Sequence, residues 1–88
     1  YFVRVIGDSM SGARIEPGDI LIVDSSRDVV NQKIVVAWYN GELTVKRIQL
    51  DTPPLVVLLP ANPNYLPIYV QPDDAFDVLG VVTFVIQK

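Results

Sequence analysis

The sequence alternates between short apolar runs rich in β-forming residues and clusters of turn-forming residues, and this alternation limits the possible folds. The runs that we expect to form strands are residues 2–6, 20–23, 33–39, 42–50, 55–59, 68–70 and 76–86. Many short strands separated by frequent turn signals are typical of a barrel or folded sheet, whereas βαβ units need helical segments between strands. We therefore predict an all-β domain, a small folded sheet or partial barrel of short, mostly antiparallel strands.

Glycine and proline mark the positions of the turns. Asn40-Gly41 is the pair best suited to a type I′ hairpin, and it joins two of the predicted strands directly. Pro17-Gly18-Asp19 and the polar, glycine-rich residues 7–12 are two further turns. Pro53-Pro54 breaks the chain before the next strand. Gly80 interrupts the last apolar run, which predicts a bend or bulge there, in one strand or between two.

Length and composition fit one small globular domain. A chain of 88 residues is near the lower limit at which a single core suffices. With 50% hydrophobic and 19% charged residues, it can bury enough apolar surface to fold. Its longest apolar stretches are too short to span a membrane. The opening residues Tyr1-Phe2-Val3-Arg4 include neither an initiator Met nor a signal-peptide pattern, so we expect a fragment or processed form of a longer protein.

Two residue types with important chemistry are missing. Without Cys the chain has no disulfide, thiolate nucleophile or cysteine-bound zinc. Without His it lacks the usual general base, so nucleophilic chemistry near neutral pH would need a lysine or a carboxylate. The net charge of −3 and the scattered basic residues argue against direct binding to nucleic acid. We expect neither a metal nor a cofactor.

Lys46 is one candidate for the base. Alternation along the predicted strand at 42–50 puts Glu42, Thr44, Lys46 and Ile48 on one face. Arg47 must point the other way, so at least one of these two cations faces inward or into a cleft. An exposed lysine is the ordinary case in a strand. A partly buried Lys46 would instead have a pKa lowered from about 10.4, because burial disfavours the ammonium form, and could accept a serine proton.

Ser9 is a candidate nucleophile, although a serine in a glycine-flanked turn is usually a cap or turn former. Ser11, Ser25 and Ser26 could be nominated on equal grounds. In a functional turn the Ser9 hydroxyl would be exposed, and nearby backbone N–H groups could form an oxyanion hole. The residues alone leave both readings open.

Five segments together resemble the LexA/UmuD family of self-cleaving, peptidase S24-like proteins. They are Gly7-Asp8-Ser9-Met10, residues 17–24, Leu43-Thr44-Val45-Lys46-Arg47-Ile48, residues 59–68 and Asp77-Val78-Leu79-Gly80-Val81-Val82. The resemblance runs nearly from end to end, and residues 1–4 and 19–25 look closer to UmuD than to LexA. It implies a single Ser-Lys self-cleavage domain over residues 1–88, with the fold of the LexA/UmuD C-terminal domain.

The resemblance assigns roles to four residues. Ser9 matches the nucleophile, and Lys46 matches the general base that deprotonates it. The backbone N–H groups of Ser9 and Asp8 match the oxyanion hole. Met10 would pack beneath the nucleophile in a structural role.

In this family the substrate is the protein's own upstream arm, cut at an Ala-Gly or Cys-Gly bond when the RecA–single-stranded DNA filament stimulates cleavage. The glycines of this chain follow Ile6, Ser11, Pro17, Asn40 and Leu79. None of these pairs is the expected bond, so we expect the arm with its cleavage site to lie outside these residues.

For UmuD-like proteins the trimmed form is an accessory subunit of a UmuC-type translesion polymerase in the bacterial cytoplasm. The resemblance also implies a homodimer through the C-terminal strand. Here that strand includes residues 81–86, a run apolar enough to be wholly core or half core and half interface.

Three alternatives belong to other classes. A LexA-type or phage-type repressor would carry this domain behind a DNA-binding module. A type I signal peptidase also uses a Ser-Met motif and a Lys-Arg pair, but it needs a membrane anchor, and the Asn-containing segment after Leu59 favours the LexA/UmuD family instead. A pure interaction module would keep the serine and lysine without using them.

Overall fold

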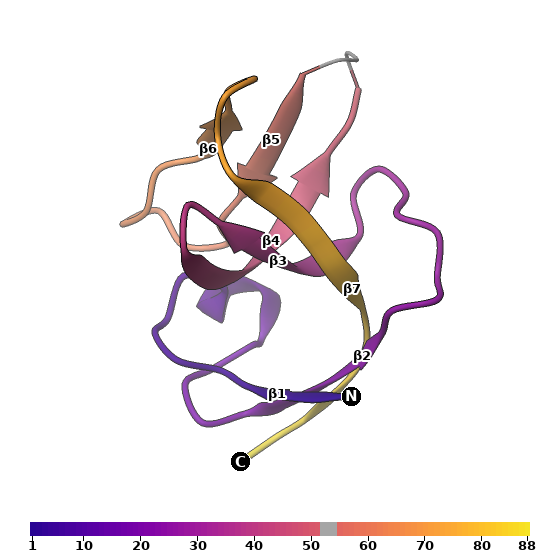
Figure 1. Cartoon of the computed structure of the whole chain (residues 1–88). Coiled ribbons are helices and arrows are strands. Elements are labelled where there is room, and N and C mark those ends of the chain that lie inside the picture. Colours follow the sequence, from indigo (N-terminus) through magenta and orange to yellow (C-terminus); the bar gives the residue numbers. More distant parts are fainter. Residues whose placement is uncertain (52–54) are drawn as a thin grey trace.

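The computed structural model describes residues 1–51 and 55–88, which form one seven-stranded antiparallel sheet (Figure 1). The strands are β1 (Phe2–Arg4), β2 (Ile20–Asp24), β3 (Ile34–Tyr39), β4 (Glu42–Gln49), β5 (Val56–Leu59), β6 (Ile68–Val70) and β7 (Phe76–Ile86). Their order across the sheet is β1-β2-β7-β3-β4-β5-β6, and the sheet is not closed. The predicted all-β class is confirmed. The predicted break at Pro53-Pro54 lies outside the described residues, and the short 3₁₀ turn η1 (Ser11–Ala13) was not predicted.

The β3–β4 hairpin has the predicted turn. Asn40 and Gly41 have φ angles of 47° and 88°, so both central residues are left-handed, as a type I′ turn requires. Tyr39 pairs with Glu42 directly across the turn. This turn fixes the register of β4, and therefore which face of the sheet Lys46 occupies.

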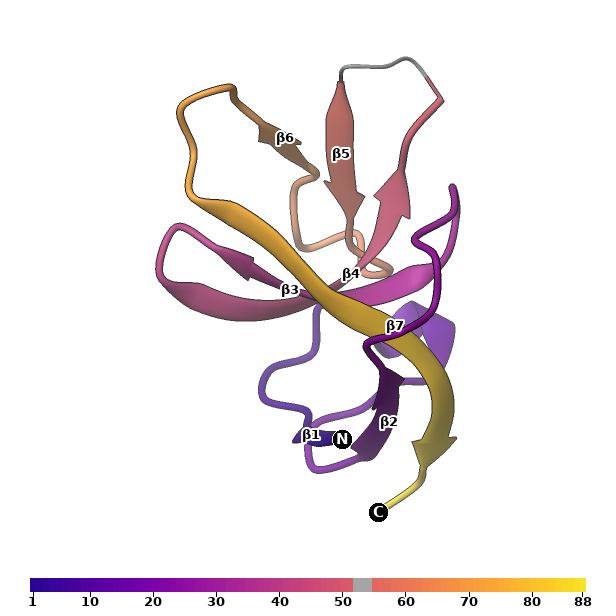
Figure 2. The same ribbon diagram turned by 45° about the vertical axis from the view of Figure 1, so that its right-hand side comes forward.

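Strand β7 joins the two halves of the sheet, and Figure 2 shows it crossing the molecule from the β6 side to the β2 side. It pairs with β3 through its first half and with β2 through its second half. Leu79 and Thr83 are each an extra residue in these ladders, so β7 carries two bulges. A Cβ on Gly80 would lie 2.6 Å from Val23 Cγ1. The predicted bulge near Gly80 is confirmed, within one continuous strand.

The first strand is shorter than predicted. It ends at Arg4, because its partner β2 begins at Ile20, directly opposite. Val5 bonds instead to the turn before β2: its N–H donates to the Asp19 carbonyl at 2.8 Å, and its carbonyl accepts from Gly18 N–H at 2.9 Å. The chain is thereby released from the sheet and enters the loop that carries Ser9.

Two apolar clusters form the core. Neighbouring residues Val35 and Val36 of β3 point to opposite faces of the sheet, and each belongs to a different cluster. The first cluster contains Val5, Met10, Ile15, Leu21, Val23 and Val36. The second contains Val35, Ile48, Leu58 and Val81. The first cluster lies beneath the loop that carries Ser9, and the second lies beneath the later part of β4. The Ser9 loop and the strand that carries Lys46 are therefore supported by different parts of the core.

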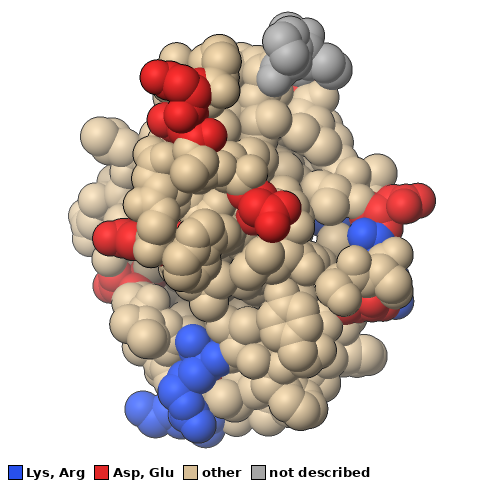
Figure 3. Space-filling model, viewed as in Figure 1, with Lys and Arg blue, Asp and Glu red and all other residues tan. Residues whose placement is uncertain are grey.

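Most of the surface in Figure 3 is uncharged, with separate acidic side chains at its upper left, centre, left and right, and basic ones at its lower left and right. Within residues 1–51 and 55–88, no helix is long and apolar enough to cross a membrane.

Candidate active site

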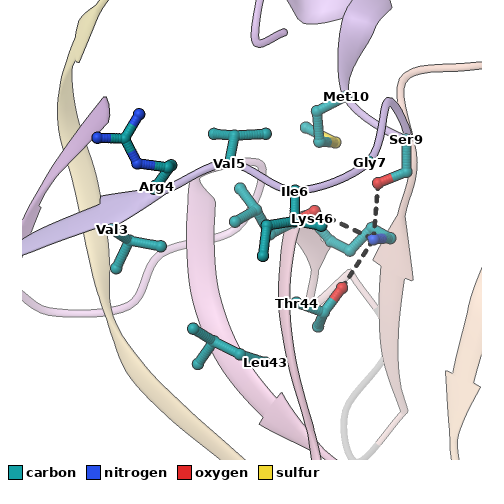
Figure 4. Close-up of a pocket in the computed structure, with 11 residues that line it drawn as sticks. Val3, Arg4, Val5, Ile6, Gly7, Ser9, Met10, Leu43, Thr44 and Lys46 are labelled. Carbon is teal, nitrogen blue, oxygen red and sulfur yellow. Dashed lines mark hydrogen bonds between the residues drawn. The ribbon is translucent and has the colours of Figure 1, made fainter. Parts of the chain in front are cut away.

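Lys46 is buried on β4, with only 8% of its surface exposed. Its Nζ lies 2.9 Å from Ser9 Oγ, donates to Thr44 Oγ1 at 2.7 Å and contacts the Val45 carbonyl oxygen at 3.2 Å (Figure 4). The three partners match the three N–H donors of a lysine ammonium group. Of the two readings of Lys46 in the sequence, the structure favours the buried one.

Burial lowers the pKa of Lys46 below the ordinary lysine value, because the ammonium form loses its hydration. The contacts of Nζ are two hydroxyls and a carbonyl, none of which carries a negative charge that would offset this effect. A neutral amine therefore becomes accessible at a lower pH than for an exposed lysine.

Arg47 points to the opposite side of β4, as alternation predicts. Its guanidinium donates to the Gln32 carbonyl at 2.7 Å, away from Ser9. Thr44 shares the Lys46 face and holds its amine in place, a role that sequence reasoning did not assign. The alternation of side chains along the strand puts Thr44 beside Lys46, and this pattern could have predicted the contact.

Ser9 and Lys46 meet in a cleft of about 120 Å³. One wall is the end of β1 and the chain that follows it, from Val3 to Gly7, and the other is the first half of β4, from Leu43 to Lys46 (Figure 4). β4 pairs with β5 only through residues 47–49, so the edge of β4 that borders this cleft has no neighbouring strand among the residues described. An unpaired strand edge of this kind is one to which an extended peptide can add as a further strand, here beside Ser9.

The loop bearing Ser9 is anchored by its neighbour Met10, which is 2% exposed and lies in the first core cluster. The Met10 carbonyl also accepts from Ala13 N–H at 3.0 Å and from Ile15 N–H at 3.3 Å. Met10 thus packs beneath the loop as expected, while the Ser9 side chain faces Lys46.

The segment after β5 holds the loop from its other side. Ala61 N–H donates to the Ser9 carbonyl at 2.8 Å, and Gly12 N–H donates to the Ala61 carbonyl at 2.6 Å. A Cβ on Gly12 would overlap the Ala61 carbonyl oxygen, so this close approach requires glycine.

Two side chains of the same segment contact Asp8. Asn62 Nδ2 donates to the Asp8 carbonyl at 2.9 Å, and the Tyr65 hydroxyl donates to Asp8 Oδ1 at 2.5 Å. The hydrogen bond to Asp8, and then the charge of that carboxylate, raise the pKa of Tyr65. Sequence reasoning gave neither residue a role, since only the family-like pattern of residues 59–68 pointed to this segment.

The backbone N–H groups of Asp8 and Ser9 donate no hydrogen bond to any part of the chain that the structure describes. Both are therefore available to a bound carbonyl oxygen, the property that an oxyanion hole needs.

The other serines nominated from the sequence do not contact Lys46. Ser11 Oγ accepts from Asn62 Nδ2 at 3.3 Å. Ser26 Oγ donates to Asp24 Oδ1 at 2.6 Å, and Ser25 is exposed in the same loop after β2. Of the four serines, only Ser9 is brought to a candidate base.

A family model described as "Peptidase S24-like" matches residues 1–83. The chain is 43% identical over all of its 88 residues to Protein SamA of Salmonella typhimurium, of which it covers 59%. It is 42% identical over 88 residues to the LexA repressor of Albidiferax ferrireducens, covering 39% of that protein. It is 43% identical over 84 residues, 94% of the chain, to Protein MucA of Escherichia coli, covering 56%. The chain thus spans between about two fifths and three fifths of these relatives' lengths.

Proposed function

The chain belongs to the peptidase S24-like family, and we propose that it is the self-cleaving domain of a UmuD-like protein of the DNA-damage response. Residues 1–88 form one cleaving domain in this proposal, and the substrate is an upstream arm with an Ala-Gly or Cys-Gly bond. The observation that carries the proposal is the 2.9 Å separation of Ser9 Oγ and the buried Lys46 Nζ.

In the proposed reaction, neutral Lys46 accepts the proton of the Ser9 hydroxyl as Oγ attacks the carbonyl carbon of the scissile bond. The carbonyl oxygen becomes an oxyanion and is bound by the backbone N–H groups of Asp8 and Ser9. The Lys46 ammonium then gives its proton to the departing amine as the C–N bond breaks. A water molecule hydrolyses the resulting ester, with Lys46 again acting as base.

The cleavage rate should rise with pH and then level off. Only the neutral amine can take the Ser9 proton, so the rate follows deprotonation of Lys46. Because burial lowers the pKa of Lys46, the midpoint should fall below the ordinary value of about 10.4. The measurement is the first-order rate of self-cleavage of the full-length gene product between pH 6 and 11. A flat profile would contradict lysine as the base.

We further propose that β7 forms a homodimer interface. Phe2, Ile22 and Phe84 are in register across β1, β2 and β7, so they form one row. Phe2 is 70% and Phe84 68% exposed, far more than expected for large side chains without a partner surface. Beyond residue 81, β7 has no partner on its β3 side within the described part of the chain. A second copy pairing there would extend the sheet and cover these aromatic side chains.

Phe84→Lys should therefore weaken dimerisation at least about a hundredfold, because it puts a charge into the proposed apolar interface. Sedimentation of the full-length gene product over nanomolar to micromolar concentrations measures this effect. Tyr69→Lys on β6 is the matched control, since Tyr69 is 56% exposed on the opposite edge of the sheet. A monomeric unsubstituted protein at micromolar concentration, or an unchanged dimer in Phe84→Lys, would exclude this interface.

The partners in this proposal are the RecA filament, which stimulates cleavage, and a UmuC-type polymerase, which the trimmed form accompanies in lesion bypass. The support is the likeness of residues 1–4 and 19–25 to UmuD. Lesion bypass by such a polymerase with and without the trimmed chain is the direct test.

The cleavage and dimerisation domain of a LexA-type repressor is the second candidate, supported by the LexA repressors among the relatives. The gene sequence upstream of Tyr1 separates the two: a DNA-binding domain identifies a repressor, and a short arm identifies a UmuD-like protein.

A further inference from the structure

The Asp8–Ser9 peptide group is held by a residue that lies outside the cleft lining. Asn62 Nδ2 donates to the Asp8 carbonyl oxygen at 2.9 Å, across 54 residues of sequence. Within the loop, Ser11 N–H donates to the same oxygen at 3.2 Å. The long-range bond from Asn62 is the shorter of the two, and it joins the loop to a separate part of the chain.

The Asn62 side chain is itself fixed. Its Oδ1 accepts from Asn64 N–H at 2.9 Å. Because that acceptor end is occupied by an N–H donor, the Nδ2 end is the one that faces Asp8. The Asn62 carbonyl also accepts from Tyr65 N–H at 3.1 Å, so the turn that presents Asn62 is closed by its own backbone.

The orientation of this peptide group determines the direction of a catalytically relevant N–H. In a planar trans peptide the C=O and the following N–H point in opposite directions. Holding the Asp8 carbonyl toward Asn62 therefore directs the Ser9 N–H away from the segment between β5 and β6, residues 60–67. That N–H donates to no described residue, and it is one of the two oxyanion donors in the proposed function.

Tyr65 acts on the same residue. Its hydroxyl holds Asp8 Oδ1 at 2.5 Å, which ties the carboxylate to the segment that carries Asn62. A carboxylate free to turn toward Ser9 would oppose the negative charge that develops on the substrate oxygen. Both contacts to Asp8 thus favour the same arrangement of the loop.

We propose that Asn62 is a positioning residue, which orients the Asp8–Ser9 peptide group so that the Ser9 N–H is ready to bind the oxyanion. This inference rests on the proposed function. The Asn62 side chain makes no hydrogen bond to Lys46 or to the Ser9 hydroxyl, so we expect its effect to be on the oxyanion and not on proton transfer from Ser9.

The test uses Asn62→Ala and Asn62→Asp in the full-length gene product, with first-order self-cleavage rates measured across pH. Asn62→Asp still accepts from Asn64 N–H but cannot donate to Asp8. Both variants should lower the plateau rate by about 10- to 100-fold, less than outright loss of an oxyanion donor because Ser11 still holds the carbonyl. The pH midpoint should stay unchanged, and Tm should fall only modestly, because the lost hydrogen bonds are made by a side chain near the surface. Asn64→Ala, which keeps its backbone N–H, should cleave within twofold of the unsubstituted protein.

Asn62→Ala with a rate within twofold of the unsubstituted protein would overturn the inference. So would a shifted pH midpoint, which would mean that Lys46 had been disturbed. If Asn62→Asp cleaved slowly while Asn62→Ala cleaved normally, the effect would come from the added charge, and this result would also overturn the inference. Lys46→Ala in the same series tests the dyad: if it cleaves, the proposed function fails, whereas an inactive Lys46→Ala beside a fully active Asn62→Ala excludes only the positioning role.

Discussion

Lys46→Ala and Ser9→Ala should each lower the rate of self-cleavage at least about a thousandfold. Lys46 Nζ and Ser9 Oγ lie 2.9 Å apart, and residues 1–88 contain no histidine that could replace the lysine as base. Since the two groups would act as one unit, the double variant should be no slower than either single variant. Full-length gene product incubated at alkaline pH, with the cleaved fraction followed by gel electrophoresis, gives the rates.

Matched controls separate chemistry from folding. Lys33 and Ser25 are exposed, and Lys33→Ala and Ser25→Ala should cleave at the unsubstituted rate. Lys46→Met keeps the buried hydrocarbon stem but not the amine, so it should be folded by circular dichroism and equally inactive. Cleavage that persists in Lys46→Met would remove lysine from the mechanism.

Gly12→Ala should both destabilise the protein and slow cleavage strongly. The new Cβ would overlap the Ala61 carbonyl oxygen and lie 3.1 Å from its carbon. Because these are backbone atoms, either the loop or residues 60–67 after β5 must move, at a cost of about 1–3 kcal/mol. A displacement of about 1 Å at Ser9 would slow cleavage about a hundredfold. Tm and the first-order cleavage rate measure the two effects.

Gly41→Ala distinguishes a general loss of stability from a displaced nucleophile. Gly41 has a φ of 88°, and a Cβ added there would meet no heavy atom within 4 Å, so alanine introduces backbone strain without a clash. It lies in the hairpin turn, outside the cleft lining. We expect a lower Tm with cleavage retained. Unchanged cleavage in Gly12→Ala would mean that the close contact with Ala61 does not position Ser9.

Local sequence patterns predicted most of the fold. Turn residues such as Asn40-Gly41 have a backbone requirement that does not depend on the rest of the chain, so the hairpin and its register could be predicted. The end of β1 could not be predicted in this way, because the strand stops at Arg4, opposite Ile20, where its partner β2 begins. Strand order could not be predicted either, since nothing local places β7 between β2 and β3.

The same distinction applies to the site. Alternation along β4 predicted that Lys46 and Arg47 face opposite sides, but the burial of Lys46 depends on residues from elsewhere in the chain. The meeting of Ser9 with Lys46 spans 37 residues, so the residues themselves only made it chemically possible, and the family resemblance supplied the expectation. Asn62 is hydrogen-bonded to the Asp8 carbonyl, and Thr44 is hydrogen-bonded to the Lys46 amine. Residue types alone did not distinguish these hydrogen bonds from ordinary polar contacts.

The central place of β7 has a consequence for when the domain acquires its structure. Among the strands that the structure describes, β7 comes latest in chain order, yet within the sheet it alone links the β1–β2 pair to the strands from β3 to β6. While the chain is being synthesised, these two parts can form local contacts but have no common sheet until residues 76–86 leave the ribosome. Pairings between such distant segments fold slowly. Until β7 has been synthesised, Ser9 and Lys46 therefore lie on parts of the chain that share no sheet.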